Sequence, residues 1–408
     1  MKKYVLYFDP YVYAKIINNK LLLYNTLNHK TINICLNKII KRIISNLLKE
    51  SNLYSVILTQ DEYNNIDLQD FLEKIRSNFM GDAYETTYNY FKPIQPIPVL
   101  IDHLPQKTDD FLDLPSHLSS INLFINNEIS ILEEKYPKKN QFKWYLQGKI
   151  NKELDSGIII DILESLQSTN VEINLIGDIF KHCAYEEIIE VVRSSNRKIN
   201  FMIKSSALDG SKLNTLISNQ GKIHLLIDDS NCLKAMNDDL LFTKNNLINY
   251  HFAVSSQDDF VLIKDWQSIN GVRNLHIHPY YNGKNLEFFK KNVFSDENSI
   301  IHQNLSIQDI YSRKIINTNA YGTIYITNEG IVQTNLNSSI IGNLKINNIW
   351  DIIKTEIINK QSIWRNVRSK VFPCNKCLFT DLCPSISNYE YVLERFNLCN
   401  IKNEMKNE

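Results

Sequence analysis

Strand-length apolar stretches alternate with helical stretches through the middle of the chain, and this alternation is the strongest constraint on the fold. The predicted strands are Ile121–Ile125, Val171–Ile176, Lys198–Lys204, Lys222–Asp228, Asn249–Val254 and Arg273–His278. The predicted helices between them are Ile158–Gln167, Tyr185–Ser194, Ser211–Ser218 and Phe260–Ser268. Repeated βα units predict a parallel sheet with right-handed crossovers, on which ligands bind at the C-terminal ends of the strands. Six units are too few for a closed eight-stranded barrel and indicate an open α/β barrel.

A cysteine-rich segment near the C-terminus carries the clearest chemical signal. Its C-x2-C-x5-C-P run and one later cysteine contain four of the seven cysteines, namely Cys374, Cys377, Cys383 and Cys399. A C-x2-C turn directs two thiolates at one metal, and two further sulfurs complete a zinc site or hold an iron–sulfur cluster. Two disulfides are the alternative. Because we find no signal peptide and no membrane-spanning stretch, we expect a cytoplasmic protein, whose reducing surroundings favour a metal.

Length and charge set the outer limits. The 408 residues are enough for two or three domains. The formal net charge is zero, so no basic surface predicts nucleic acid or an anionic membrane as a partner.

The N-terminal region reads as short strands followed by helices. We predict strands at Tyr4–Phe8, Tyr13–Ile17, Leu21–Tyr24, Thr31–Ile34 and Ser55–Leu58, and helices at Ile39–Leu48 and Leu68–Asn78. This order resembles the small winged-helix-like domain that binds leader peptides in ribosomal peptide maturation. Such a domain holds a leader as an added strand on a sheet edge. The alternative is that the region is only a cap on the main domain.

The segment before the cysteines also has a recognisable order. Alternating apolar residues around Asn328-Glu329-Gly330 predict a hairpin, and Trp350–Ile358 predicts a helix. Hairpin, helix and C-x2-C-x5-C-P together resemble the SPASM domain of radical-SAM peptide maturases. The resemblance implies one auxiliary [4Fe-4S] cluster on the four cysteines, with zinc as the alternative. A second cluster would need a cysteine at the position of Ser387 and one on each side of the hairpin, where Asn, Thr and Tyr stand, so we interpret it as lost.

The cysteine loop of an active radical-SAM enzyme has no counterpart here. Such a loop, C-x3-C-x2-C, follows the first strand, whereas Ile121–Ile125 is followed by Asn126-Asn127-Glu128-Ile129-Ser130. The second strand ends in Gly177-Asp178, where active relatives have a Gly-Gly-Glu-Pro-like run. We therefore expect no S-adenosylmethionine and no radical chemistry. Cys183 and Cys232 stand alone, which predicts buried, inert thiols.

Taken together, these features resemble the pseudo-radical-SAM protein of Bacteroidetes double-glycine peptide systems. The segments that carry this resemblance are Tyr24–Leu27, Pro279–Leu286, Cys374–Glu390 and Asn397–Cys399. The resemblance implies an α/β fold in three domains. These are a winged-helix-like peptide-recognition domain (1–95), an open partial (β/α)6 barrel of radical-SAM type (96–310) and a SPASM-like domain (311–408). It also implies two partners, a radical-SAM maturase and a precursor peptide with a Gly-Gly leader.

Other residue patterns leave no catalytic group to name. His276 and His278 share one face of a strand and could bind a metal, but core or surface histidines are the commoner explanation. The pairs Asp228-Asp229 and Asp258-Asp259 could act as acid–base groups, but more often such residues cap a helix.

Two functions from different classes follow. The favoured one is a non-catalytic partner that presents a precursor peptide to a maturase. The alternative is a redox or catalytic component that uses the remaining iron–sulfur cluster.

Overall fold

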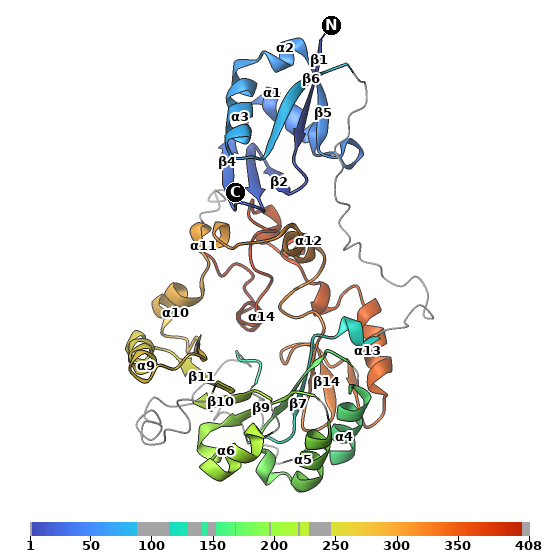
Figure 1. Ribbon diagram of the computed structural model, residues 1–408, viewed down its shortest axis with the longest axis vertical. Helices are drawn as coiled ribbons and strands as arrows, with labels where there is room; N and C mark the ends of the chain where they lie inside the picture. Colours follow the sequence, from blue (N-terminus) through green and yellow to red (C-terminus); the bar gives the residue numbers. More distant parts are fainter. Residues whose placement is uncertain are drawn as a thin grey trace.

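The computed structural model describes residues 2–87, 114–128, 141–144, 152–167, 169–195, 197–218, 221–227 and 246–401. Figure 1 shows the N-terminal region at one end of the long axis and a large sheet at the other, with C-terminal segments between them. Asp228, Asp229 and Cys232 lie outside the described residues. Within the described part of the chain, no helix is long and apolar enough to cross a membrane.

The N-terminal region contains two antiparallel three-stranded sheets. β1 (Lys3–Phe8) lies between β5 (Ser55–Thr59) and β6 (Gly81–Thr86), and β3 (Lys20–Asn25) lies between β2 (Val12–Ile17) and β4 (Thr31–Cys35). The predicted strands are confirmed, and β6 was not predicted. The first strand pairs with β5 and β6, and not with the β2–β3–β4 sheet that follows it.

Three helices complete this region: α1 (Lys38–Leu47), α2 (Gln60–Tyr63) and α3 (Ile66–Ser77). Helix α1 buries Ile40, Ile43, Ile44 and Leu47, which recur at the spacing of one helical face. These side chains join those of α3 and of both sheets in one apolar core.

The large sheet follows the predicted βα order. Its parallel strands are β7 (Ser120–Phe124), β8 (Glu172–Ile176), β9 (Ile199–Lys204), β10 (Ile223–Ile227), β11 (Ile248–Val254) and β12 (Leu275–Pro279). The helices between them are α4 (Ser156–Ser165), α5 (Tyr185–Ser194), α6 (Gly210–Ile217) and α9 (Gln257–Asn270). The predicted strands and helices of this region are confirmed.

The C-terminal hairpin extends the same sheet. β13 (Thr323–Ile326) runs parallel to β7, and β14 (Ile331–Gln333) and β15 (Gly342–Asn343) continue it antiparallel. Within the described residues, the result is an open nine-stranded sheet with β12 and β15 at its edges. The predicted domain boundary after residue 310 stays a prediction.

The two faces of the large sheet differ. One face packs against helices such as α4, α5 and α6 through residues such as Leu175, Ile203 and Leu225. Side chains alternate along a strand, so the opposite face, here called the inner face, carries Phe124, Ile176 and Leu226. Any ligand bound on the side of the sheet away from α4, α5 and α6 would meet this inner face.

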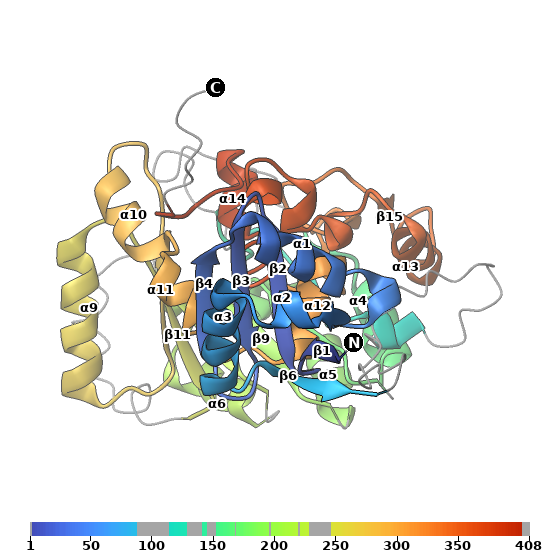
Figure 2. The same cartoon turned by 90° about the horizontal axis from the view of Figure 1, so that it is seen from above.

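The remaining helices connect and cover these parts. They are α10 (Leu286–Val293), α11 (Glu297–Ile301), α12 (Ile307–Ile315), α13 (Ile349–Ile358) and α14 (Asn388–Leu393). Figure 2 looks down the long axis, with the β2–β3–β4 sheet in front of the segment around α12.

Candidate functional site

The four predicted cysteine ligands come together in the C-terminal region. All four are free thiols, and Cys374 and Cys383 are buried while Cys377 and Cys399 are half-buried. Burial raises the pKa of Cys374 and Cys377, and raises that of Cys383 to about 12; the nearby Cys399 thiol adds to each rise. Four free thiols are a donor set that zinc or an iron–sulfur cluster accepts as thiolates, so the residues present fit a metal centre.

A buried arginine connects the segments that carry these cysteines. Arg368 donates to both carboxylate oxygens of Glu390, at 2.8 and 3.0 Å, and its Nη1 lies 3.6 Å from the Cys374 Sγ. Nη1 also donates to the Phe396 carbonyl at 3.0 Å, and Nε donates to the Pro384 carbonyl. The Arg368 guanidinium therefore links three segments of the chain: the one at Cys374, the one just after Cys383 and the one just before Cys399.

Sequence reasoning missed both members of this ion pair. Ser387-x2-Glu390 is a capping-box pattern and could have placed Glu390 at the start of α14, but no pattern marks Arg368. Ser387 stands where a second cluster would need a cysteine. Its backbone N–H and its hydroxyl both donate to Glu390 Oε2, at 2.8 and 3.1 Å. It therefore acts as a helix cap.

The spacing of the four sulfur atoms bears on the kind of metal. Among the described residues, no three of these cysteines have sulfur atoms that all lie within 4.8 Å of one another. A single zinc ion, at about 2.3 Å from each thiolate, brings the sulfurs to roughly 3.8 Å from one another. No three of these sulfurs therefore lie as close together as the ligands of an occupied zinc site.

The strand ends of β7 and β8 are closed by amide and carboxylate groups. Asn126 donates to the Asp178 carbonyl at 2.8 Å and accepts from the Asp178 N–H at 3.0 Å. Gly177 has φ +134°, and the Asn126 oxygen lies where a side chain at Gly177 would stand. Beside this loop, Glu128 pairs with Lys181 at 2.9 Å in a small pocket that Lys204 and Lys212 also line. Burial raises the pKa of Asp178.

A row of histidines crosses the inner face of the sheet. His224 Nδ1 lies 2.8 Å from His251 Nε2, and His251 Nδ1 lies 3.0 Å from His278 Nε2. His276 stacks on His251 at 4.7 Å between ring centroids, and Trp144 meets His278 edge-on at 4.5 Å. The predicted His276–His278 pair is thus part of a larger group, because neighbouring parallel strands place His224 and His251 on the same face.

The histidine row is neutral at pH 7. Burial lowers the pKa of His224 and His278 to about 4 and that of His251 to about 2, and the nearby imidazoles add to these shifts. Each neutral ring has one donor and one acceptor nitrogen, so the three can form a directional hydrogen-bonded chain. The row is linear and does not bring three nitrogens to one point, as a metal site would require.

A second group contains Glu153, His182 and Cys183, whose ligand atoms lie within 4.8 Å of one another. His182 Nε2 donates to the Leu154 carbonyl at 2.8 Å, and His182 Nδ1 accepts from the Ala184 N–H at 3.2 Å. Both imidazole nitrogens are therefore occupied by the backbone, and the group does not offer three free ligands.

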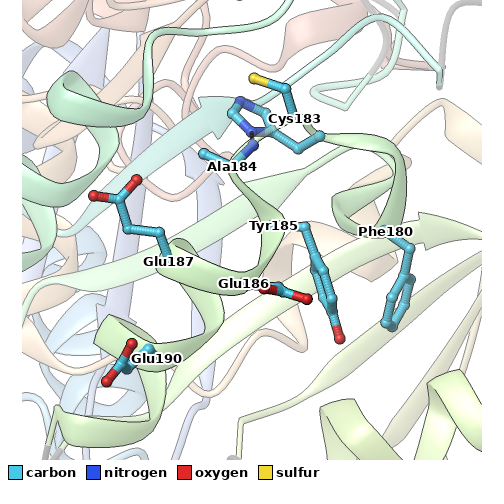
Figure 3. Close-up of a pocket in the computed structure, with 8 residues that line it drawn as sticks. Phe180, Cys183, Ala184, Tyr185, Glu186, Glu187 and Glu190 are labelled. Carbon is cyan, nitrogen blue, oxygen red and sulfur yellow. Dashed lines mark hydrogen bonds between the residues drawn. The ribbon is translucent and has the colours of Figure 1, made fainter.

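The prediction that Cys183 is a buried thiol is wrong. Cys183 is exposed because it lies in the turn that leads into α5, beside a pocket with Glu186, Glu187 and Glu190 (Figure 3). The Glu153 carboxylate raises the pKa of the Cys183 thiol, so the thiol is not activated.

Two of the segments that carried the family resemblance form turns. Asn25 is buried, accepts from the Leu27 N–H at 2.9 Å and donates to the Phe79 carbonyl at 2.8 Å. Asn285 donates to the Ser255 and Tyr280 carbonyls, both at 2.8 Å. These asparagines have structural roles.

The aspartates after β11 belong to a helix terminus. Asp258 and Asp259 lie in the first turn of α9. Ser256 is the N-cap, and its hydroxyl donates to the Asp259 carboxylate at 2.7 Å. The interpretation of Asp258 and Asp259 as caps is wrong, because Ser256 is the N-cap and the two aspartates lie inside the first turn of the helix.

Comparisons with known proteins are limited to structural likeness. No family model and no curated protein matches the chain. A crystal structure of Streptococcus suis SuiB bound to S-adenosylmethionine aligns with 97% of this chain and 100% of its own, at 11% identity and a TM-score of 0.47. SuiB bound to precursor peptide SuiA gives the same coverage at 12% identity and a TM-score of 0.44. BtrN in complex with AdoMet and 2-DOIA aligns with 64% of this chain and 92% of its own, at 13% identity and a TM-score of 0.35. Scores below 0.5 do not establish a shared fold.

The first prediction concerns the cysteine centre. Cys377→Ser removes one thiolate, so we expect bound iron plus zinc to fall about tenfold or more. Because metal binding is coupled to folding, amide exchange should rise across the last ~40 residues. Metal analysis and hydrogen-exchange mass spectrometry measure the two effects. Cys35→Ser, at an exposed thiol on β4, is the matched control. Full metal content in a variant with all four cysteines replaced by serine would contradict the assignment.

The second prediction concerns the histidine row. An unfolded histidine has a pKa near 6.5, so below that pH the unfolded chain binds protons that the folded row does not. Stability is therefore fully present above about pH 6.5 and falls as the pH drops toward 4, by up to about 1.4 kcal/mol per pH unit for each imidazole.

In the variant His251→Gln, the free energy of unfolding should fall less steeply as the pH drops. Urea unfolding at pH 7, 6 and 5 measures the slope of the free energy of unfolding. His302→Gln, at an exposed histidine outside the row, should leave the slope unchanged. Equal slopes for His251→Gln and the unmodified protein would refute the interpretation.

Proposed function

We propose that this chain is a non-catalytic partner in the maturation of a ribosomally made peptide in the cytoplasm. In this role it binds a precursor peptide with a Gly-Gly leader, an active radical-SAM maturase, or both. The observation that carries the proposal lies at the strand ends, where Asn126 and Asp178 hydrogen-bond to each other. The sequence has no cysteine between Cys35 and Cys183, so the segment after β7 offers no thiolate to an iron–sulfur cluster, which supports binding rather than radical chemistry.

The N-terminal region offers a strand edge for a peptide. Within the described residues, β4 pairs with β3 alone. The Asn25 N–H donates to the Lys30 carbonyl, and the Leu36 N–H donates to the Asn19 carbonyl. These two bonds set the register between β3 and β4. Ile32 and Ile34 therefore pair with β3, and Asn33 directs its N–H and C=O away from β3. An extended peptide can add to such an edge through its main chain.

The cysteine centre completes the proposal. Cys374, Cys377, Cys383 and Cys399 would hold one [4Fe-4S] cluster, with zinc as the alternative. Such a cluster could supply electron transfer, but the proposed function needs it only as a structural centre.

The third prediction tests peptide binding at the β4 edge. Asn33→Pro removes an outward N–H without removing a bond between β3 and β4, so the fold should persist. We expect a fluorescently labelled precursor peptide to bind the full-length variant about tenfold more weakly or worse. Fluorescence anisotropy measures the affinity.

The matched control for this test is Asn33→Ala, which keeps the backbone N–H and should bind as the unmodified chain does. The Asn33 side chain makes only an exposed 3.5 Å contact with Glu297, so its loss should matter little. Unchanged affinity in Asn33→Pro would move the peptide site away from β4.

The fourth prediction tests the absence of radical chemistry. The full chain, reconstituted anaerobically with iron and sulfide and given a reductant, should form no 5′-deoxyadenosine from S-adenosylmethionine. The reason is that the loop after β7 provides no thiolates for the cluster that binds this cofactor. Production of 5′-deoxyadenosine above a no-protein control would show that the chain is a radical enzyme.

A further inference from the structure

The β2–β3–β4 sheet is buried on both faces. Leu21 and Leu23 face the core of the N-terminal region, whereas Tyr13, Leu22 and Tyr24 face the C-terminal region. Leu22 is 0% exposed although it points away from its own core. The N-terminal region is therefore packed directly against another part of the chain.

The surface that receives this sheet is largely the loop between the second and third cysteines. The apolar cluster around Tyr13, Leu22 and Tyr24 includes Leu378, Phe379, Leu382 and Cys383, with Ile300, Leu305 and Ile310 from the preceding helical segments. One predicted metal ligand, Cys383, is thus itself a member of the interface cluster.

Buried polar contacts fix the same interface. The Tyr13 hydroxyl donates to the Asp381 carboxylate at 2.7 Å, and the two residues are 2% and 6% exposed. Lys15 forms an ion pair with Asp381 at 3.2 Å. The Tyr24 hydroxyl donates to the Gln303 carbonyl at 2.6 Å and accepts from the Leu305 N–H at 3.1 Å. These directional bonds require the loop to keep one conformation.

The loop has little regular structure of its own to maintain that conformation. Residues 377–387 contain turns but no helix or strand. Leu382 and Cys383 both donate to the Phe379 carbonyl, at 3.0 and 2.8 Å, and the Thr380 hydroxyl bonds the carbonyls of Cys374 and Cys377. A metal on Cys377 and Cys383 would tie down both ends of this loop.

We infer that the cysteine centre positions the N-terminal region: a metal on the four cysteines orders the loop Leu378–Leu382, and this loop holds the β2–β3–β4 sheet in place. The inference rests on the metal centre of the proposed function, but not on peptide binding. It gives the centre a role that needs no electron transfer, which is to hold the β2–β3–β4 sheet in a fixed position against the segments around α11, α12 and the cysteine loop.

Metal binding and docking of the β2–β3–β4 sheet must favour each other equally. If the metal favours the docked sheet by some factor, docking favours metal retention by the same factor, and couplings of this kind are commonly 5- to 150-fold. Both directions can be measured on the full-length chain.

The first measurement removes the metal from the unmodified protein with a chelator under anaerobic conditions. Lys15 acetylation by a soluble N-hydroxysuccinimide ester, followed by mass spectrometry, reports docking, because Lys15 is paired with the buried Asp381. We expect about tenfold faster acetylation of Lys15 after metal removal. Lys2, whose side chain is 59% exposed, should react at an unchanged rate.

The second measurement disrupts docking and follows the metal. Leu22→Asp places a charge in the interface while leaving the core face of β3 intact, so metal loss to the chelator should be about tenfold faster. Ile57→Asp, at a residue 41% exposed on the same region, is the matched control and should lose metal at the unmodified rate.

Three outcomes would overturn the inference. They are an unchanged Lys15 rate after metal removal, equal metal loss in Leu22→Asp and Ile57→Asp, and a purified chain that takes up neither iron nor zinc. The chelator experiment decides the question even if Leu22→Asp does not fold. A chain that binds no precursor peptide but passes both measurements would refute the peptide role alone.

Discussion

The buried ion pair between Arg368 and Glu390 is the contact on which the C-terminal region depends. This part of the chain contains short helical turns and little regular structure, so side chains must satisfy backbone groups that a ladder would otherwise pair. Arg368 does so for the carbonyls of Pro384 and Phe396 while its charge is balanced by Glu390. Removing one partner from such a buried pair typically costs about 3–5 kcal/mol, because the other charge is left unpaired.

The positions of the cysteines depend on the Arg368–Glu390 ion pair and on the carbonyl groups that Arg368 binds. The segments linked by Arg368 are those that carry Cys374, Cys383 and Cys399, so the guanidinium holds these segments near one another. The loop between Cys377 and Cys383 in turn contacts Tyr13, Leu22 and Tyr24. A continuous set of contacts thus runs from Arg368 through the cysteine loop to the N-terminal sheet.

The inner face of the large sheet is built differently from its helix-covered face. The helix-covered face is continuous apolar core, whereas the inner face carries a histidine row and a ladder in which Asn200 donates to Asn174 and Asn174 donates to Asn122. Buried polar side chains are usually paired, and these rows pair across neighbouring strands, although His224 Nε2 has no hydrogen-bond partner among the described residues. Such a surface suits polar contacts with a ligand, and Phe142 and Trp144 cover part of it.

The sequence by itself determined the strands and helices of the βα region and marked the cysteines that could bind a metal. Alternation of apolar stretches located the strands from β7 to β12 and the helices between them, because burial on a sheet or a helix face imposes a period on the chain. The C-x2-C-x5-C run marked Cys374, Cys377 and Cys383 as candidate metal ligands, because a C-x2-C turn directs two thiolates at one metal. These signals are local, and a sequence displays local spacing directly.

Only the tertiary structure decided which distant residues meet. Arg368 carries no pattern that distinguishes it from other arginines, and its partners lie in three separate segments. His224 and His251 join His278 only because parallel pairing sets neighbouring strands in register on one face. The exposure of Cys183 and the bond between Tyr13 and Asp381 depend likewise on how elements pack. Contacts between residues far apart in the chain arise from packing and pairing geometry, which no single stretch of sequence encodes.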